Sequence, residues 1–473
     1  MSFVFYDTET TGISTDFDQI LQFAAIRTDA DLREIDRFEM RCRLLPHVVP
    51  HPAALKVTGM SISQVTDPAL PCHYELVRAI RDKLLSWSPS IFVGYNSMNF
   101  DEHLLRQALF RNLHPPYLTN TDGNCRADAM LLVQAATQFS PGCLSVPIGA
   151  KGKPVFKLDQ LAPANGFNHA NAHDALADVE ATIHIARCVK DRSPACWSRF
   201  IQTSSKAGVS SMIASTPTLV LTEFYFNRPF HFVVSTLGVD PDNPAAQLCL
   251  DLKHDLDWIA GQSLNDLATW AAKSPKPIRK FRTNAAPLIA PTSDVPSEFL
   301  GGLAPSYIAA AAQRLRQDHG LRQRLIEAAV ASREEYEPSP HVEEQLYASF
   351  TPRADQTRLV AFHSAAWTDR ASIVATLEDA RLRYYGYRLI YERNPETLTP
   401  QLREYYRAHD NDRLMDATGT AKWGTLPAAL AAIPDAATDA SAAATTILRD
   451  YDDYLRERIA AVRADQASRL ALA

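Results

Sequence analysis

The feature that most constrains the fold is a short apolar run that ends in two carboxylates. Residues 3–6, Phe-Val-Phe-Tyr, predict a buried β-strand, which Asp7-Thr8-Glu9 continues before Gly12 breaks it. Side chains alternate along a strand, so Asp7 and Glu9 should point to one face and Thr8 to the other. Two carboxylates on one face of a buried strand repel each other and resist desolvation. Either a cation lies between them or at least one of them is protonated.

Strand-like and helix-like segments alternate over residues 1–193, which predicts an α/β domain with helices packed on a mixed sheet. The expected strands are 1–9, 19–29 and 90–96. The expected helices are 74–87, 100–111, 157–166 and 173–190.

The pattern changes twice in the rest of the chain. Residues 194–345 predict a β-rich domain with appended helices, because short strands alternate there with Pro, Asn, Asp and Gly. Its expected strands are 218–226, 229–238, 245–252 and 276–284, and its expected helices are 305–318 and 320–338. Residues 346–473 predict an all-helical domain, most clearly over 371–394 and 443–466, with a loose loop at 427–445.

Composition narrows the setting. The net charge of -6 excludes a general polybasic coat, so any nucleic-acid site must be a local patch. The seven cysteines include no C-x-x-C pair, which is typical of reduced thiols in a cytosolic protein. We find no signal peptide, membrane span or coiled-coil seam. The sequence therefore predicts a soluble, cytoplasmic monomer without a membrane partner.

Two further motifs supply partners for the first carboxylates. Asn99 is the expected N-cap of a helix that carries Asp101 in its first turn. His173 is expected at or just before the start of another helix, with Asp178 one turn inside. Oxygen ligands of this kind suit Mg²⁺ or Mn²⁺, and two such ions can assist an in-line phosphoryl displacement. A histidine can orient or deprotonate the attacking water, so the residues predict metal-assisted phosphodiester hydrolysis.

The spacing of these motifs resembles the DEDDh proofreading-exonuclease superfamily. Asp7-Thr8-Glu9, the stretch 96–101 and the pair His173/Asp178 match its three motifs in order. Within the superfamily, residues 22–29 and 158–183 and the long C-terminal extension resemble the bacterial exodeoxyribonuclease I family. The resemblance is strong over 1–193 and fainter over the remainder. It implies a ribonuclease-H-like nuclease domain (1–193), an SH3-like domain with appended helices (194–345) and a helical C-terminal domain (346–473).

The resemblance also implies a function and residue roles. The function is 3′→5′ degradation of single-stranded DNA to 5′-mononucleotides, in DNA repair and recombination, with two Mg²⁺ ions for which Mn²⁺ can substitute. Asp7, Glu9 and Asp178 would ligate one ion, Asp7 and Asp101 the second, and His173 would be the general base. The location implied is the bacterial cytoplasm, with nucleoid-associated activity.

Other residues are predicted to bind the substrate or a partner. Those assigned to the substrate are Thr8, Thr10 and Thr11, whose loop the resemblance implies would grip the terminal nucleotide, together with Lys157, Lys280 and Arg282. Lys280 and Arg282 should share one face of a strand, where they could follow a phosphate backbone. Four arginines on neighbouring helices could instead bind an acidic peptide, for which the resemblance suggests the C-terminal tail of single-stranded DNA-binding protein: Arg314, Arg316, Arg322 and Arg324.

Three alternatives stay open at this point. One is an exoribonuclease or proofreading exonuclease of the same superfamily, although the long extension after residue 193 disfavours it. Another is a catalytically silent nucleic-acid-binding protein, although all five catalytic positions are filled. A nucleotidyl transferase could use the paired carboxylates but gives no reason for His173.

Overall fold

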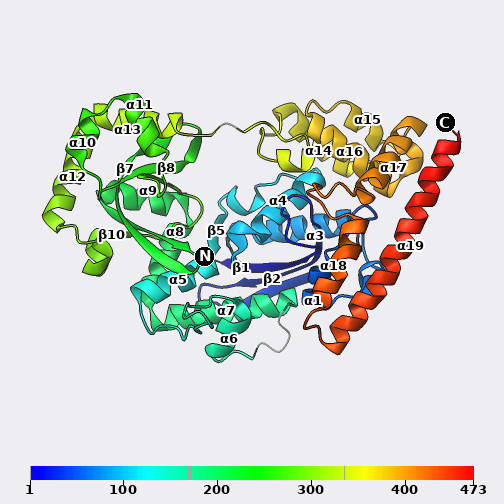
Figure 1. The fold of residues 1–473 in the computed structure, drawn as a ribbon, viewed down its shortest axis with the longest axis horizontal. Helices are drawn as coiled ribbons and strands as arrows, with labels where there is room; N and C mark the ends of the chain where they lie inside the picture. The colour runs from blue at the N-terminus through cyan, green and yellow to red at the C-terminus, as the bar shows by residue number, and fades with distance from the viewer. Residues whose placement is uncertain (1, 169–172, 335, 473) are drawn as a thin grey trace.

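The computed structural model describes residues 2–168, 173–334 and 336–472 (Figure 1). The chain forms two five-stranded sheets and a helical C-terminal region. In Figure 1 the second sheet lies to the left of the N-terminal sheet and the last helices to its right. Within the described ranges, no helix is both long and apolar enough to cross a membrane.

The N-terminal sheet has the strand order β3-β2-β1-β4-β5. Its strands are β1 (Phe3–Thr10), β2 (Ile20–Thr28), β3 (Glu34–Arg41), β4 (Ile91–Gly94) and β5 (Cys125–Asp128). Strand β2 pairs antiparallel with both β1 and β3, whereas β1, β4 and β5 are parallel. The sheet is therefore mixed, as predicted, with β1 at its centre.

Both faces of this sheet are covered by helices, which is why β1 is buried at every position except Asp7, which is half-buried. The helices of one face are α5 (Ala129–Phe139), α7 (Ala175–Arg192) and α8 (Pro194–Ser204), packed against Phe3 and Phe5. The helices of the other face are α3 (His73–Ser86) and α4 (Asp101–Arg111), packed against Val4 and Tyr6. The alternation of residues 3–6 between two cores confirms the predicted strand.

The second sheet is antiparallel throughout, with the order β10-β6-β7-β8-β9. Its strands are β6 (Leu219–Tyr225), β7 (Arg228–Asp240), β8 (Asn243–Asp251), β9 (Ile278–Arg282) and β10 (Ile289–Pro291). One face packs on α10 (Leu256–Gly261), α11 (Leu264–Ala271), α12 (Pro305–Gln317) and α13 (His319–Ala331). The other packs on α9 (Lys206–Ser215).

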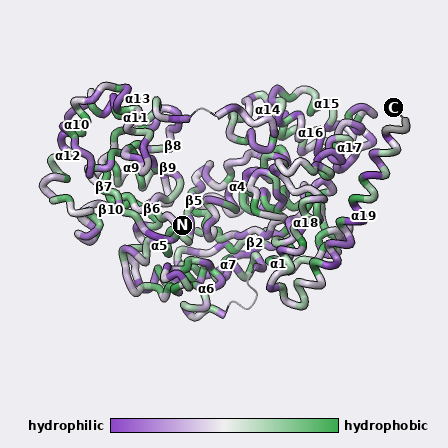
Figure 2. The backbone as a smooth tube through the Cα atoms, viewed as in Figure 1, coloured by the Kyte–Doolittle hydropathy of each residue, from purple (hydrophilic) through white to green (hydrophobic). Residues whose placement is uncertain are grey.

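The C-terminal helices return to the N-terminal domain and pack on it at two places. The helices α14 (Arg353–Ser364), α15 (Arg370–Ala375) and α16 (Ala380–Arg393) share a core with residues of α3 and α4. The helices α18 (Leu426–Ala437) and α19 (Ala442–Leu472) pack on α1 (Pro52–Thr58) and α2 (Ile62–Val65). Figure 2 shows long hydrophobic stretches on the central strands, whereas α19 at the edge of the molecule is largely hydrophilic.

Several local expectations were wrong. Asn99 is not the N-cap of α4, because it lies in a 3-10 turn and Phe100 occupies the cap position. The predicted helix 371–394 is divided into α15 and α16, since the Asp379 carboxylate caps the second helix. Residues 427–437 lie in α18 rather than in a loop, and α13 ends at Ala331.

The polar edge strand β3, the short strand β5 and helix α5 were not predicted at all. The domain boundaries remain predictions. Helix α8, beyond the proposed boundary at residue 193, packs in the N-terminal core through Trp197 and Phe200.

Candidate active site

Three carboxylates meet at the end of strand β1. Asp7 and Glu9 share the face of β1 on which α7 packs, and Asp178 lies in the first turn of that helix. One carboxylate oxygen from each of the three residues lies within 4.8 Å of the others. The predicted clustering of Asp7, Glu9 and Asp178 is therefore present, and the spacing suits one cation shared among them.

Asp101 approaches the same place from the opposite face of the sheet. Thr8 points away from Asp7 and Glu9, and its Oγ1 donates a 2.6 Å hydrogen bond to Asp101 Oδ1. Asp101 is the first residue of α4 and is only 4% exposed. It is not a member of the 4.8 Å group, but its charge contributes to the raised pKa of Asp7. The middle residue of the D-x-E motif thus orients the fourth carboxylate.

Asp128, which sequence reasoning missed, fixes the turn that leads to Asp101. Its carboxylate oxygens accept hydrogen bonds from the backbone N–H groups of Asn96 (2.8 Å) and Met98 (3.1 Å). The same side chain accepts from Met130 N–H and so caps α5. Asn96 has a left-handed φ of 60°, a conformation that asparagine tolerates better than most residues. A signal was present, since an aspartate before an apolar run is a common helix start.

His173 lies in an exposed turn immediately before α7, as predicted, with a φ of 68°. The next residue, Asp174, caps the helix and is tied to both neighbouring strands. Arg41 Nη2 donates to its carboxylate at 2.9 Å and Gln22 Nε2 at 3.1 Å. Residues 169–172 lie outside the described ranges. Two strands therefore anchor the residue that follows the candidate base.

Burial and mutual repulsion dominate the electrostatics of the cluster. Burial, then the charges of Asp101, Asp178 and Glu9, hold the pKa of Asp7 well above its usual range. Burial, followed by the charge of Asp178, raises the pKa of Glu9 to about 8. Burial raises the pKa of Asp101 to about 6, although the hydrogen bond from Thr8 opposes this. Without a cation, the site holds protons that carboxylates normally release, so the residues present fit a divalent metal ion.

The loop after β1 is built from internal contacts. Thr10 Oγ1 donates to Gly12 O at 2.7 Å, and Thr11 Oγ1 donates to Asp18 Oδ1 at 2.7 Å. A side chain at Gly12 would meet the Asp18 carboxylate, 2.6 Å from the position of its Cβ, which explains the glycine. Thr8, Thr10 and Thr11 are all buried, and their role in substrate binding stays a prediction.

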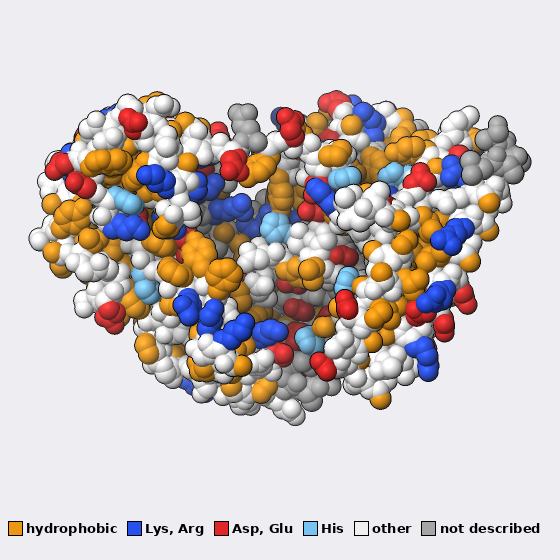
Figure 3. All heavy atoms as spheres, in the orientation of Figure 1, with side chains coloured by type: hydrophobic (Ala, Val, Ile, Leu, Met, Phe, Trp, Pro, Cys, Tyr) orange, Lys and Arg blue, Asp and Glu red, His pale blue; other side chains and the backbone are white. Residues whose placement is uncertain are grey.

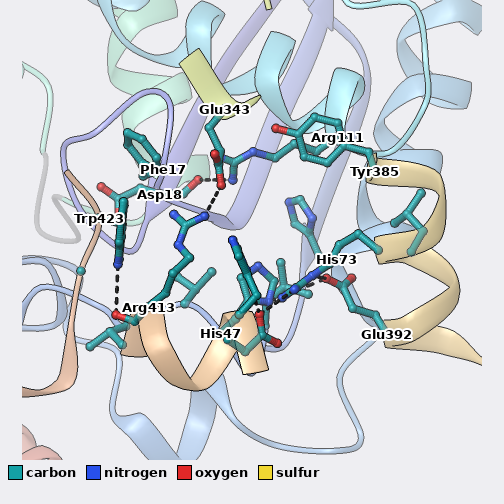
Figure 4. Close-up of a pocket in the computed structure, with 18 of the residues that line it drawn as sticks. Phe17, Asp18, His47, His73, Arg111, Glu343, Tyr385, Glu392, Arg413 and Trp423 are labelled. Carbon is teal, nitrogen blue, oxygen red and sulfur yellow. Dashed lines mark hydrogen bonds and ion pairs between the residues drawn. The ribbon is translucent and has the colours of Figure 1, made fainter. Parts of the chain in front are cut away.

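A polar pocket joins this loop to the C-terminal helices (Figure 4). Asp18 and Phe17 from the loop face Arg413 and Trp423 across the pocket. The Arg413 guanidinium pairs with the Glu343 carboxylate and lies 4.1 Å from the centre of the Trp423 ring. The C-terminal region therefore packs against the loop that follows β1.

The predicted phosphate contacts are exposed. Lys280 and Arg282 occupy the solvent face of β9, with Phe281 turned to the core between them, so the predicted shared face is confirmed. Lys280 Nζ lies 3.7 Å from Asp240 Oδ2. The charge of Arg282 adds to burial, the main cause, in lowering the pKa of His103 on α4. Lys157 is exposed just before α6 (Leu158–Ala164). Their contacts with substrate stay predictions.

Three of the four arginines predicted to bind a partner already have partners within the chain. Arg314 pairs with Asp257 at 2.6 Å. Arg322 donates to the backbone oxygens at the end of α12, and Arg324 donates to those at the end of α10. Arg316 is exposed. The four stay a prediction as a peptide site, and only Arg316 presents a side chain that has no hydrogen bond or ion pair within the described ranges.

The chain is similar to known nucleases along most of its length. Residues 4–186 match the family model described as Exonuclease, and residues 340–458 match the Exonuclease I C-terminal domain. Exodeoxyribonuclease I of Haemophilus influenzae is 27% identical over 399 residues, which are 80% of this chain and 84% of the relative.

Solved structures agree with this. Exonuclease I from Methylocaldum szegediense aligns with a TM-score of 0.83 and 28% identity, over 97% of this chain and 99% of that one. Escherichia coli exonuclease I in complex with a dA16 oligonucleotide aligns with a TM-score of 0.82 and 24% identity, over 96% and 99%.

The exonuclease match implies dependence on a divalent metal ion, which agrees with the acidic cluster. One family model covers the strand that holds Asp7 and Glu9 and the helices that hold Asp101 and Asp178, and the other covers most of the C-terminal helices. The fold matches over nearly the whole chain, including the second sheet between them. The chain is a nuclease and belongs to the exodeoxyribonuclease I family.

Proposed function

We propose that the protein is a 3′→5′ exodeoxyribonuclease that degrades single-stranded DNA to 5′-mononucleotides. The observation that carries this proposal is the meeting of Asp7, Glu9 and Asp178 within 4.8 Å, with His173 at the start of the helix that bears Asp178. Solved complexes of the E. coli relative are described as holding dA16, dT13 and single-stranded DNA. We propose with it that the protein acts in DNA repair in the bacterial cytoplasm and that it is a monomer.

The cofactor that we propose is Mg²⁺, with Mn²⁺ as a substitute. Asp7, Glu9 and Asp178 would hold one ion, and Asp7 with Asp101 a second. Bound ions stabilise the attacking and leaving oxygens of an in-line displacement at phosphorus. The protein contributes the positions of the ligands: Thr8 holds the Asp101 carboxylate by a 2.6 Å hydrogen bond. Because the cluster carries raised pKa values, cation binding must release protons.

His173 is the proposed general base. Its exposed turn gives the imidazole access to solvent water, and an imidazole nitrogen can accept a proton from that water. The Asp174 carboxylate is held by Arg41 and Gln22, so the backbone just after His173 has a fixed position. This anchoring limits the orientations from which the imidazole can reach the scissile phosphate.

The DNA strand is proposed to reach this site through the central hollow between the second sheet and the N-terminal domain. Figure 3 shows Lys and Arg side chains on the wall of this hollow below the second sheet, and acidic side chains on its floor. The exposed cations of β9, Lys280 and Arg282, with Lys157, are the proposed phosphate contacts. These exposed cations would attract the DNA backbone, whereas the acidic floor would repel it when no metal ion is bound. The affinity for DNA would therefore depend on both the salt concentration and the metal ion.

The proposed protein partner is the acidic tail of single-stranded DNA-binding protein. A relative has been solved with the description "SSB/Exonuclease I". In this chain Arg316 is the exposed candidate, and Arg314, Arg322 and Arg324 could exchange internal partners for an acidic peptide. Titration calorimetry with a tail peptide at low salt tests this, and the absence of heat would remove the proposal.

The decisive experiment uses 5′-labelled and 3′-labelled single-stranded DNA, with Mg²⁺ or EDTA, for wild type and Asp7→Asn. Immediate release of the 3′ label as mononucleotide, by wild type with metal only, is the expected result. Faster degradation of a matched RNA would favour the exoribonuclease alternative. Binding without hydrolysis in both proteins would favour a binding protein.

A further inference from the structure

The tip of the β6–β7 hairpin holds an aromatic residue in a strained position. Phe226 and Asn227 form its two-residue turn, with φ values of 52° and 60°. Such turns favour Asn and Gly, and a bulky residue in the left-handed region costs free energy. The Phe226 side chain is nevertheless 88% exposed, so packing does not offset that cost. Strain at an exposed residue without a packing role is a reason to ask what the residue binds.

The hairpin tip is docked on the N-terminal domain beside the catalytic turn. Asn227 Nδ2 donates to Pro154 O at 3.3 Å, and the Phe224 ring meets the Phe156 ring edge-on at 5.7 Å. Tyr95 OH donates to Phe156 O, and Tyr95 directly precedes the turn that leads to Asp101. The hairpin tip that carries Phe226 is thus docked on residues that contact the start of the turn to Asp101.

The surface around this tip is basic. Residues 141–158 include Lys151, Lys153 and Lys157 but no Asp or Glu, and Arg228 follows the turn. In the described part of the chain, none of these four cations forms an ion pair. Figure 3 shows a row of Lys and Arg side chains on the lower rim of the hollow. We call Phe226, Arg228, Lys151 and Lys153 the hairpin rim.

We propose that the hairpin rim binds an unpaired stretch of the DNA strand as it enters the site, with Phe226 stacked on a base. This inference rests on the proposed function and adds a determinant of strand selection to it. Aromatic rings with spaced cations are how proteins hold single strands without reading sequence. In a duplex both faces of each base are covered by the neighbouring bases, so a rigid Phe ring can stack only on bases of an unpaired stretch. Arg228, Lys151 and Lys153 contact the phosphates on either side of that base.

The turn conformation provides a test that separates binding from folding. Phe226→Gly removes the ring and relieves the left-handed strain, so the variant should unfold at the same or a higher temperature than wild type. Its affinity for 5′-fluorescein-dT20, measured by anisotropy in EDTA, should fall about tenfold, the size of one lost base–aromatic stack. Phe226→Trp should keep the wild-type affinity. Trp258→Ala, at an exposed aromatic on α10, is the matched control and should bind like wild type.

The charged part has its own readout. The double variant Lys151→Ala/Lys153→Ala should reduce the slope of log affinity against log salt by about 1.4, because each of the two single-strand contacts contributes about 0.7. Phe226→Gly should leave that slope unchanged.

Wild-type binding and Mg²⁺-dependent degradation of dT20 are measured in the same preparations. If wild type binds and degrades dT20 while Phe226→Gly binds as tightly, the rim proposal is overturned and the proposed function stands. Equal loss of affinity in Phe226→Gly and Phe226→Trp also overturns it, since a stacking surface would survive in the tryptophan variant. If wild type does not bind dT20 at all, both proposals fall.

Discussion

Replacing Glu9 by Gln should stabilise the metal-free protein while it abolishes hydrolysis. Burial and the nearby carboxylates raise the pKa of Glu9 from an ordinary 4.5 to about 8. Between these values the folded state binds more protons than the unfolded state, so this group makes folding less favourable as pH rises through that window. The difference between pH 7 and the ordinary pKa of 4.5, at 1.36 kcal/mol per pH unit, destabilises the folded state by about 3 kcal/mol. Glu9→Gln removes this destabilisation. The cost approaches its full value above pH 8.

The assay is thermal unfolding in EDTA at pH 5, 7 and 8.5, repeated with excess Mn²⁺. Wild type should lose stability from pH 5 to 8.5, and Glu9→Gln should lose less. Mn²⁺ should stabilise wild type more than the variant, because the ion binds the folded state only. Glu457→Gln, at an exposed position on α19, controls for the loss of any one carboxylate. A variant no more stable than wild type in EDTA at pH 7 would refute the electrostatic account of the site.

Three further substitutions test the site and its support. Thr8→Val removes the hydrogen bond to Asp101 without changing shape, and should raise the Mn²⁺ concentration needed for half-maximal activity about tenfold, with little change in melting temperature. Arg41→Ala releases one side of the Asp174 anchor and should lower turnover roughly fivefold, while binding of dT20 in EDTA stays the same; an unchanged turnover would contradict a positioning role. Leu455→Ala opens a cavity under α19 and should cost about 2–5 kcal/mol in urea unfolding, whereas a cost under about 1 kcal/mol would mean that α19 contributes little to stability.

The carboxylate pattern could be predicted because it depends on local geometry. Alternation along β1 places Asp7 and Glu9 together whatever the rest of the chain does, and the helix start at Asp174 places Asp178 one turn inside. Asp101 was predicted as a fourth member, but no local rule says that it would come from the other face and be held by Thr8. That contact depends on how α4 packs across the sheet.

Long-range partners were the part that sequence could not supply. Arg322 and Arg324 look like a free basic surface in the sequence, yet they bind the carbonyl ends of α12 and α10. Strand β5 has only four residues, and its position is fixed by pairing with β4 rather than by its own pattern. The Asp128 network follows from that pairing, so it too appears only in three dimensions.

The return of α19 to the N-terminal domain has a consequence for how the chain folds. Tyr451 OH donates a 2.6 Å hydrogen bond to Pro50 O, between residues 401 positions apart, and both lie beside a core shared by α1, α2, α18 and α19. Contacts between such distant residues carry a large loop-closure entropy and slow the search for the native state. During synthesis, the apolar residues of α1 and α2 stay uncovered until more than three hundred further residues have been added and α18 and α19 can pack on them. We expect folding to finish late and to depend on chaperones, with the N-terminal domain aggregating when the last helices are delayed.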